Sequence, residues 1–241
     1  MNNTGYIALS RQTTLMRQMD VVANNIANAN TTAYKGEHVL FKEYLTQRSA
    51  DLPMSYVEDI AVKRDTQQGN LLPTENALDI AIQGDGYVVV DTPAGPRYSR
   101  GGTFQLDADR RIVTTQGYPL NGDNDQPITV GDANARITIS REGTVLANER
   151  PVGKIRLVSF ENEQQLRKTA GGLYTTDAEP QPVAKPLVLQ GMIEQSNVQP
   201  IVEMTRMMDV LRSFQANQKM VEGEHERQLK AIREIPNLQS S

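Results

Sequence analysis

The chain has 241 residues, with 25 basic and 29 acidic side chains, a formal net charge of -4 and no cysteine. The missing cysteine excludes disulfides and thiolate metal sites, and the interspersed charges form no basic stripe of the kind that binds nucleic acid. No apolar run approaches the roughly 18 residues that span a bilayer, and no secretory signal is visible. We therefore expect no nucleic-acid partner, no direct membrane insertion and no cleaved signal peptide.

Residues 1–35 are predicted to form an N-terminal assembly helix with one apolar face. Leu15, Met19, Val22 and Ile26 recur at alternating steps of four and three residues. This is the stride of a coiled-coil seam, in which each apolar residue contacts a neighbouring helix. We therefore expect these four residues to belong to a self-assembly surface.

The end of this helix is rich in asparagine, with Asn24, Asn25 and Asn28 close together. Asparagine is costly inside an isolated helix because its side chain competes for backbone hydrogen bonds. The segment is therefore either a frayed helix end or a set of amides that bond to neighbouring helices and fix their register. In the second case the three asparagines join the self-assembly surface.

Residues 36–77 carry mixed signals. Short apolar stretches at residues 39–41 and 44–45 are followed by Pro53 and polar residues. We interpret this segment as an extended, partly irregular connector.

Residues 78–165 change to the two-residue period of β-strands. Leu78, Ile80 and Ile82 alternate with Asp79 and Ala81, and further apolar runs follow between turns rich in Gly, Pro, Asn and Asp. Short strands with a turn about every 8 to 12 residues predict a central antiparallel β domain, either a sandwich or an irregular barrel.

Residues 166–195 contain two adjacent glycines and three prolines and are predicted to be a return linker. Residues 196–241 are predicted to form the C-terminal assembly helix, with Pro200 in its first turn. Its apolar positions follow the same ladder of three- and four-residue steps, which places on the self-assembly surface Met204, Met207, Leu211, Phe214 and Val221.

Together these elements predict an α+β chain whose long terminal helices pack as a coiled-coil-like bundle in an assembly. Burying the C-terminal seam recovers roughly 10 to 20 kcal/mol, whereas ordering the backbone of about 35 residues costs on the order of 35 to 70 kcal/mol. Helical hydrogen bonds offset that cost only in part. The helices therefore need packing on several sides, most simply from neighbouring chains.

Candidate catalytic and metal-binding groups do not form a site. His38 and His225 lie far apart in the sequence and lack further ligands. Residues 84–86, Gly-Asp-Gly, fit a hairpin turn better than a phosphate loop, and residues 123–125, Asp-Asn-Asp, lack the glycine and glutamate of a calcium loop. We therefore predict no catalytic, cofactor-binding or metal-ligating residues, no cofactor, no small-molecule substrate and no enzymatic activity.

Several patches of the sequence resemble the axial proteins of the bacterial flagellum, specifically the rod and hook group. The patches are residues 24–28, 32–35, 78–87, 98–104 and 191–204. They cover both ends and the middle of the chain, so the resemblance spans nearly its whole length. One departure from the family pattern is Ala33, where the family usually has a glycine that can adopt a left-handed backbone.

The resemblance implies a structural subunit of the flagellar basal-body rod in the periplasmic space. It implies export by the flagellar type III apparatus without cleavage, and polymerisation with copies of itself and other rod proteins into the drive shaft used for motility. The chain's length and single β domain leave the proximal-rod and distal-rod types. The opening residues 5–12 and a chain somewhat shorter than the distal-rod type resemble the proximal-rod type more, with the distal-rod type as the alternative. A coiled-coil adaptor with a β recognition domain is the alternative from another functional class.

Overall fold

The computed structural model describes residues 3–46, 54–132 and 135–234. The chain divides into two compact units, and each unit combines segments that are far apart in the sequence. Unit 1 comprises the described residues of 1–27, 37–64 and 199–241, and unit 2 comprises those of 28–36 and 65–198.

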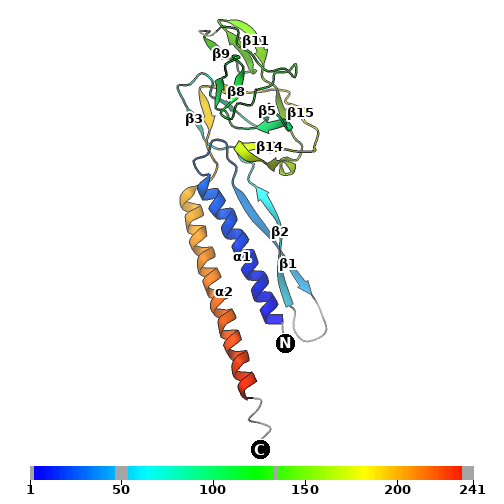
Figure 1. Ribbon diagram of the computed structural model, residues 1–241, viewed down its shortest axis with the longest axis vertical. Coiled ribbons are helices and arrows are strands. Elements are labelled where there is room, and N and C mark those ends of the chain that lie inside the picture. The colour runs from blue at the N-terminus through cyan, green and yellow to red at the C-terminus, as the bar shows by residue number, and fades with distance from the viewer. Residues whose placement is uncertain (1–2, 47–53, 133–134, 235–241) are drawn as a thin grey trace, which may run out of the picture. The chain divides into compact units, whose positions relative to one another are not determined.

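The described part of unit 1 consists of two helices and a pair of antiparallel strands that form a β-hairpin (Figure 1). Helix α1 packs against helix α2 and against both strands of the hairpin. The strands pair antiparallel, from Glu37 opposite Arg64 to Thr46 opposite Met54. The elements of unit 1 are α1 (Asn3–Ala27), β1 (Glu37–Thr46), β2 (Met54–Arg64) and α2 (Pro200–Glu234).

The hairpin lies where an extended connector was expected over residues 36–77. Residues 37–64 belong to unit 1, whereas residues 65–77 belong to unit 2. A hairpin of this kind is stabilised by pairing between distant residues and by a helix packed on its face, and neither contribution produces a local sequence period. Residues 47–53, which include Pro53 of the predicted connector, lie outside the described residues.

Unit 2 is built from short strands, and all of its described strand pairs are antiparallel. The predicted α+β class with a central antiparallel β region is thereby confirmed. The first strands of unit 2 are β3 (Leu71–Pro73), β4 (Ile80–Ile82), β5 (Tyr87–Thr92), β6 (Gly95–Ser99), β7 (Phe104–Leu106), β8 (Ile112–Thr114), β9 (Ile137–Ile139) and β10 (Thr144–Ala147). The later strands are β11 (Arg150–Lys154), β12 (Leu157–Ser159), β13 (Arg167–Lys168), β14 (Leu173–Thr175), β15 (Gln181–Pro182), β16 (Val188–Gln190) and β17 (Met192–Glu194).

The largest sheet of unit 2 has the strand order β13-β14-β6-β5-β12-β15. A second sheet has the order β11-β10-β9, and the remaining strands form the pairs β16-β4, β17-β3 and β7-β8. Two 3₁₀ turns, Glu163–Gln165 and Ala170–Gly172, connect strands of the largest sheet.

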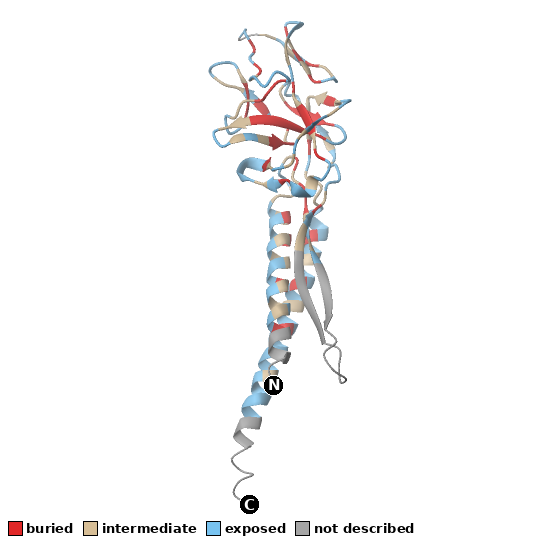
Figure 2. Cartoon of the chain, turned by 90° about the vertical axis from the view of Figure 1, so that its right-hand side faces the viewer, coloured by how far each residue is buried: buried red, intermediate tan, exposed pale blue. Residues whose placement is uncertain are grey.

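Strand β5 is buried on both faces. Its side chains alternate between two hydrophobic clusters, because Val88 and Val90 belong to one cluster and Tyr87 and Val89 to the other. Successive side chains of a strand point to opposite faces, so β5 separates two packed layers. Figure 2 shows the buried residues gathered on the strands of this unit.

The segment expected to be a return linker, residues 166–195, contains strands β13 to β17. Gln190 of β16 pairs with Ile80 of β4, and Glu194 of β17 pairs with Leu71 of β3. These strands have two or three residues each, which is too short to show a period among the glycines and prolines around them. The segment is therefore part of unit 2.

Candidate functional site

The two helices of unit 1 run antiparallel and bury one face of each. On α1 the buried residues include Ala8, Leu15 and Val22, which are seven residues apart, and on α2 they include Val210. Near one end of the pair, Nδ2 of Asn217 donates a hydrogen bond of 3.0 Å to the carbonyl oxygen of Ala8. Leu15 and Val22, predicted to contact other chains, therefore pack within their own chain.

Asn25 joins three elements at the other end of the helix pair. Its Nδ2 donates to the carbonyl oxygen of Glu37 in β1 at 2.8 Å and to Oε2 of Glu203 in α2 at 3.1 Å. Its Oδ1 accepts from the backbone N–H of Glu37 at 2.9 Å. Arg206 donates to Oε1 of Glu203, and Asn25 and Glu203 are both buried. This amide fixes the register of α1 against α2 and β1.

The neighbouring asparagines, Asn24 and Asn28, take part in bonds to residues close by in the sequence. Asn24 is exposed, and its Nδ2 donates to the carbonyl oxygen of Asp20 one turn earlier at 3.1 Å. Asn28 lies beyond the end of α1, which stops at Ala27, and its Oδ1 accepts from the hydroxyl of Thr31 at 3.2 Å. Asn25, one of the three predicted asparagines, ties α1 to both β1 and α2.

The apolar ladder predicted on α2 lies partly at the edge of the face that meets α1 and partly on an exposed face. Met207 and Phe214 are half-buried, whereas Met204, Leu211 and Val221 are exposed. On α1 the two remaining predicted residues, Met19 and Ile26, are half-buried. The predicted ladder therefore divides between a face used within the chain and a face that stays open.

One exposed apolar stripe follows the open face of α2. Ile201, Met204, Met208 and Leu211 are spaced by three, four and three residues, and their exposed fractions are 80, 51, 51 and 40%. We call these four residues the outer stripe. Ile201 and Met208 were missed by the sequence prediction, although their spacing from Met204 and Leu211 is the helical signal that identifies them.

Ala33 adopts the left-handed backbone that the flagellar axial family usually gives to glycine. Its φ is 56°, its side chain is buried, and its N–H donates to the carbonyl oxygen of Glu194 at 2.7 Å. A left-handed conformation costs an alanine about 1 to 2 kcal/mol. The hydrogen bond and the burial offset that cost, so the turn is kept without the glycine.

Unit 2 has a buried charged centre around Glu194. Oε1 of Glu194 accepts from Nζ of Lys35 at 2.5 Å and from the N–H of Gly69 at 3.0 Å, and Oε2 accepts from Nε of Arg100 at 2.9 Å. The side chains of Lys35, Arg100 and Glu194 are 3, 4 and 0% exposed. Burial lowers the pKa of Lys35, and the hydrogen bond to Glu194 opposes this shift. The Glu194 carboxylate therefore accepts from two cationic side chains and one backbone N–H.

Arg100 also connects this centre to the turn between β4 and β5. Its NH1 donates to the carbonyl oxygen of Gly86 at 2.9 Å, and its NH2 donates to that of Gly84 at 2.5 Å. Both glycines have positive φ, at 87° for Gly84 and 148° for Gly86. The Gly-Asp-Gly turn thus presents its carbonyls to a guanidinium group.

Asn197 fastens the backbone beside the same centre. Its Oδ1 accepts from the N–H of Gly36 at 2.8 Å, and its Nδ2 donates to the carbonyl oxygens of Asp65 at 3.1 Å and Gln67 at 3.0 Å. Sequence reasoning did not single out the residues of this centre, although Lys35, Arg100 and Asn197 lie in the patches that carry the family resemblance. The signal that could have identified these residues is the presence of charged and amide side chains within motifs of mostly small or apolar residues.

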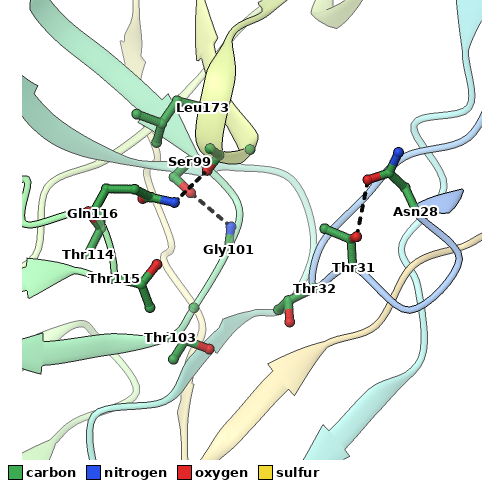
Figure 3. Close-up of a pocket in the computed structure, with 13 residues that line it drawn as sticks. Asn28, Thr31, Thr32, Ser99, Gly101, Thr103, Thr114, Thr115, Gln116 and Leu173 are labelled. Carbon is green, nitrogen blue, oxygen red and sulfur yellow. Dashed lines mark hydrogen bonds between the residues drawn. The ribbon is translucent and has the colours of Figure 1, made fainter. Parts of the chain in front are cut away.

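A hollow of about 470 Å³ lies beside the loop at residues 28–32 of unit 2 (Figure 3). Its other walls come from residues 99, 101–103, 114–116 and 171–173. The lining consists of glycines, hydroxyl and amide side chains and Leu173, with no charged group. Such a hollow holds no acid, base or activated nucleophile.

The described part of the chain contains no group of three or more His, Asp or Glu residues placed to hold a metal ion. Among the described residues, no helix combines the length and the apolar character needed to cross a membrane.

Comparison with known protein families gives three matches along the chain. Residues 6–35 match the family described as "Flagella basal body rod protein". Residues 81–147 match the "Flagellar hook protein FlgE/F/G D1 domain", and residues 189–234 match the "Flagellar basal body rod FlgEFG protein C-terminal".

Similar whole chains carry matching names. The flagellar basal-body rod protein FlgF of Caulobacter vibrioides is 35% identical over 241 residues, which cover 98% of both chains. FlgF of Mesorhizobium japonicum is 30% identical over 89% of this chain and 90% of its own. The flagellar basal-body rod protein FlgG of Bacillus subtilis is 29% identical over 97% of each chain.

Proposed function

The chain belongs to the flagellar basal-body rod protein family and is a structural subunit of the flagellar rod, and we propose that it polymerises through its terminal helices as a subunit of the proximal rod. The family is a structural one and not a family of enzymes. Membership also removes the coiled-coil adaptor as an alternative function.

The outer stripe is the observation that carries the proposed mode of assembly. Four large apolar side chains in a row on one helix face are unfavourable in water, at about 25 cal/mol for each Å² of apolar surface left exposed. Contiguous exposed apolar surface marks a site of association. The partners are copies of this chain and other rod proteins, whose helices cover the stripe.

Helix α1 carries a second exposed apolar pair that supports the same proposal. Leu9 and Met16 are seven residues apart and are 59 and 48% exposed. A spacing of seven residues returns to nearly the same face of a helix. Two helices with open apolar positions give unit 1 more than one face for neighbours, which a helical polymer needs because each subunit contacts several others.

The resemblance to FlgF supports the proximal rod over the distal rod. The Caulobacter FlgF aligns over nearly the full length of both chains at a higher identity than the Bacillus FlgG does. The family resemblance also supports export through the flagellar type III apparatus to the periplasmic space with the N-terminal segment retained. Mass spectrometry of the subunit in isolated basal bodies checks this, because the proposal expects a chain that begins at Met1 or Asn2.

The substitution Leu211→Asp tests assembly through the outer stripe. Leu211 is 40% exposed in the single chain, so the monomer tolerates a carboxylate there. Covering that carboxylate in an assembly loses about 2 kcal/mol of apolar burial and adds a desolvation cost of several kcal/mol. We expect loss of swimming and of completed rods in cells that carry this variant alone.

Glu226→Gln is the matched control, because Glu226 lies on the same helix and is exposed. Cells that carry Glu226→Gln should swim normally. Circular dichroism of purified Leu211→Asp should match that of the unaltered chain. Normal rods built from Leu211→Asp would show that the outer stripe is not an interface.

A further inference from the structure

The buried cluster of Lys35, Arg100 and Glu194 in unit 2 combines side chains from three separate parts of the chain. Lys35 lies in the first family match, Arg100 in the second and Glu194 in the third. We propose that they form a junction lock, in which Lys35, Arg100 and Glu194 make the segment 28–36 an integral part of unit 2. Unit 2 then completes its fold only when the segment 28–36 is packed into it. This inference does not depend on how the rod assembles.

The position of the lock follows from the path of the chain. The chain leaves unit 2 after Gly36, re-enters it at Asp65 and leaves it again after Val198. The N–H of Asp65 donates to the carbonyl oxygen of Gly36 at 2.8 Å, and Asn197 bonds to both of these residues. Three of the points at which the chain passes between units are thus fastened together within unit 2, next to the charged centre.

The ion pair and hydrogen bonds of Lys35 make the segment 28–36 necessary to the buried cluster. Lys35 supplies one of the two cations that pair with Glu194, and its Nζ also donates to the carbonyl oxygen of Gln67 at 2.7 Å. Without Lys35, Oε1 of the buried Glu194 carboxylate keeps the backbone N–H of Gly69 but loses its cationic partner, and loss of a hydrogen-bond partner at a buried charged group is destabilising. The segment therefore contributes a charge that the centre of unit 2 requires.

Further contacts hold the backbone of the segment in place. Nζ of Lys168 donates to the carbonyl oxygen of Lys35 at 3.1 Å and lies 3.9 Å from the centroid of the Tyr34 ring. The N–H of Ala33 donates to the carbonyl oxygen of Glu194. The folded boundary of unit 2 therefore lies before residue 28 and not after residue 35, where the end of the assembly helix was predicted.

Trypsin tests the lock directly, because it cleaves the Lys35–Gly36 bond. In dilute full-length protein we expect this bond to resist trypsin. The variant Glu194→Gln keeps the shape of the side chain but removes the charge, so we expect cleavage at Lys35 to become at least about a hundredfold faster. Unchanged protection of Lys35 in Glu194→Gln would overturn the proposal.

The matched control is Arg167→Gln, which removes an ion pair to Asp177 in the same unit whose side chains are 77 and 94% exposed. This variant should leave Lys35 as protected as before, since exposed pairs contribute little. Rapid cleavage at Lys35 in this control would contradict the proposal, because it would show that the bond opens without loss of the lock.

Hydrogen exchange of the unaltered chain decides the question if Glu194→Gln fails to fold. The amides of Ala33, Gly36 and Gly69 all donate to Glu194 or Asn197. A docked segment predicts that they exchange as slowly as the amides of the β5–β6 ladder. Exchange at these three amides much faster than in that ladder would show that the segment opens independently, and the lock would be wrong.

Discussion

The side-chain amide of Asn25 bonds to the backbone of β1 in the way that the backbone of a neighbouring strand does. Both its donor and its acceptor bond to the same residue of β1, Glu37, while a second donor bond reaches Glu203 on α2. A buried polar group without a partner costs about 1 to 3 kcal/mol. The conformation of unit 1 in which α1, α2 and β1 meet at Asn25 is therefore favoured over conformations shifted along the helix.

We predict that Asn25→Ala destabilises unit 1 by about 2 to 3 kcal/mol, because it leaves the buried Glu203 carboxylate and the Glu37 backbone short of partners. Asn24→Ala is the control one residue away and should change stability by less than about 0.5 kcal/mol, as exposed substitutions do. Thermal loss of the helical circular dichroism signal measures both. Equal effects of the two substitutions would contradict the role of Asn25.

The sequence alone located the asparagine cluster, but it did not show that Asn25 bonds to both β1 and α2. Asn24 and Asn25 have the same chemistry, and only the direction of each side chain on the helix separates them. The junction lock was less predictable still, since Lys35 and Glu194 are 159 residues apart. A buried ion pair leaves no local period, whereas a helix face or a strand does.

At the scale of elements, the strands with a clear period were predicted well and the short late strands were not. Strands β4, β5 and β10 lie where apolar residues alternate or run together between turns. Strands β13 and β15 have two residues each, and their existence depends on partners elsewhere in the sheet. Tertiary pairing, not local preference, forms such strands.

Helix α2 shows a second limit at this scale. Its apolar residues cover a broad part of the helix, so a ladder with steps of three and four fits several adjacent faces at once. The face toward α1 contains polar Glu203 and Asn217, both buried, and a search for apolar positions passes over them. The predicted ladder therefore combined residues that pack within the chain with residues that stay exposed.

The difference between the inner and outer faces predicts opposite behaviour for two aspartate substitutions in the isolated chain. Val22 is 2% exposed on α1 and Leu211 is 40% exposed on α2. Val22→Asp places a carboxylate in the helix pair and should cost unit 1 at least about 3 kcal/mol. Leu211→Asp should leave the helical signal of the monomer unchanged. Equal loss of helix in both variants would show that the two faces are not distinct.

At the scale of the whole molecule, the two units differ in how much apolar surface each buries by itself. Among the described side chains of unit 1, the buried apolar residues are Ala8, Leu15, Val22 and Val210. Unit 2 has two hydrophobic clusters and an aromatic group in which Tyr87 lies 5.9 Å from Phe160 and 5.7 Å from Tyr174 between ring centroids. We therefore expect unit 2 to fold before assembly and unit 1 to need neighbouring subunits for its full stability.

This imbalance predicts two separate unfolding transitions in the dilute full-length chain. The helical signal at 222 nm reports mainly on unit 1, and the near-ultraviolet signal of the buried tyrosines reports on unit 2, since the chain has no tryptophan. We expect the first transition at least about 10 °C below the second, because a difference of 1 kcal/mol moves the midpoint of a small domain by about 4 to 8 °C. Raising the protein concentration should raise the first midpoint and leave the second unchanged, because association stabilises only the unit that it covers. Coincident transitions at all concentrations would mean that the two units unfold as one body, and the helices would not need neighbouring subunits for their stability.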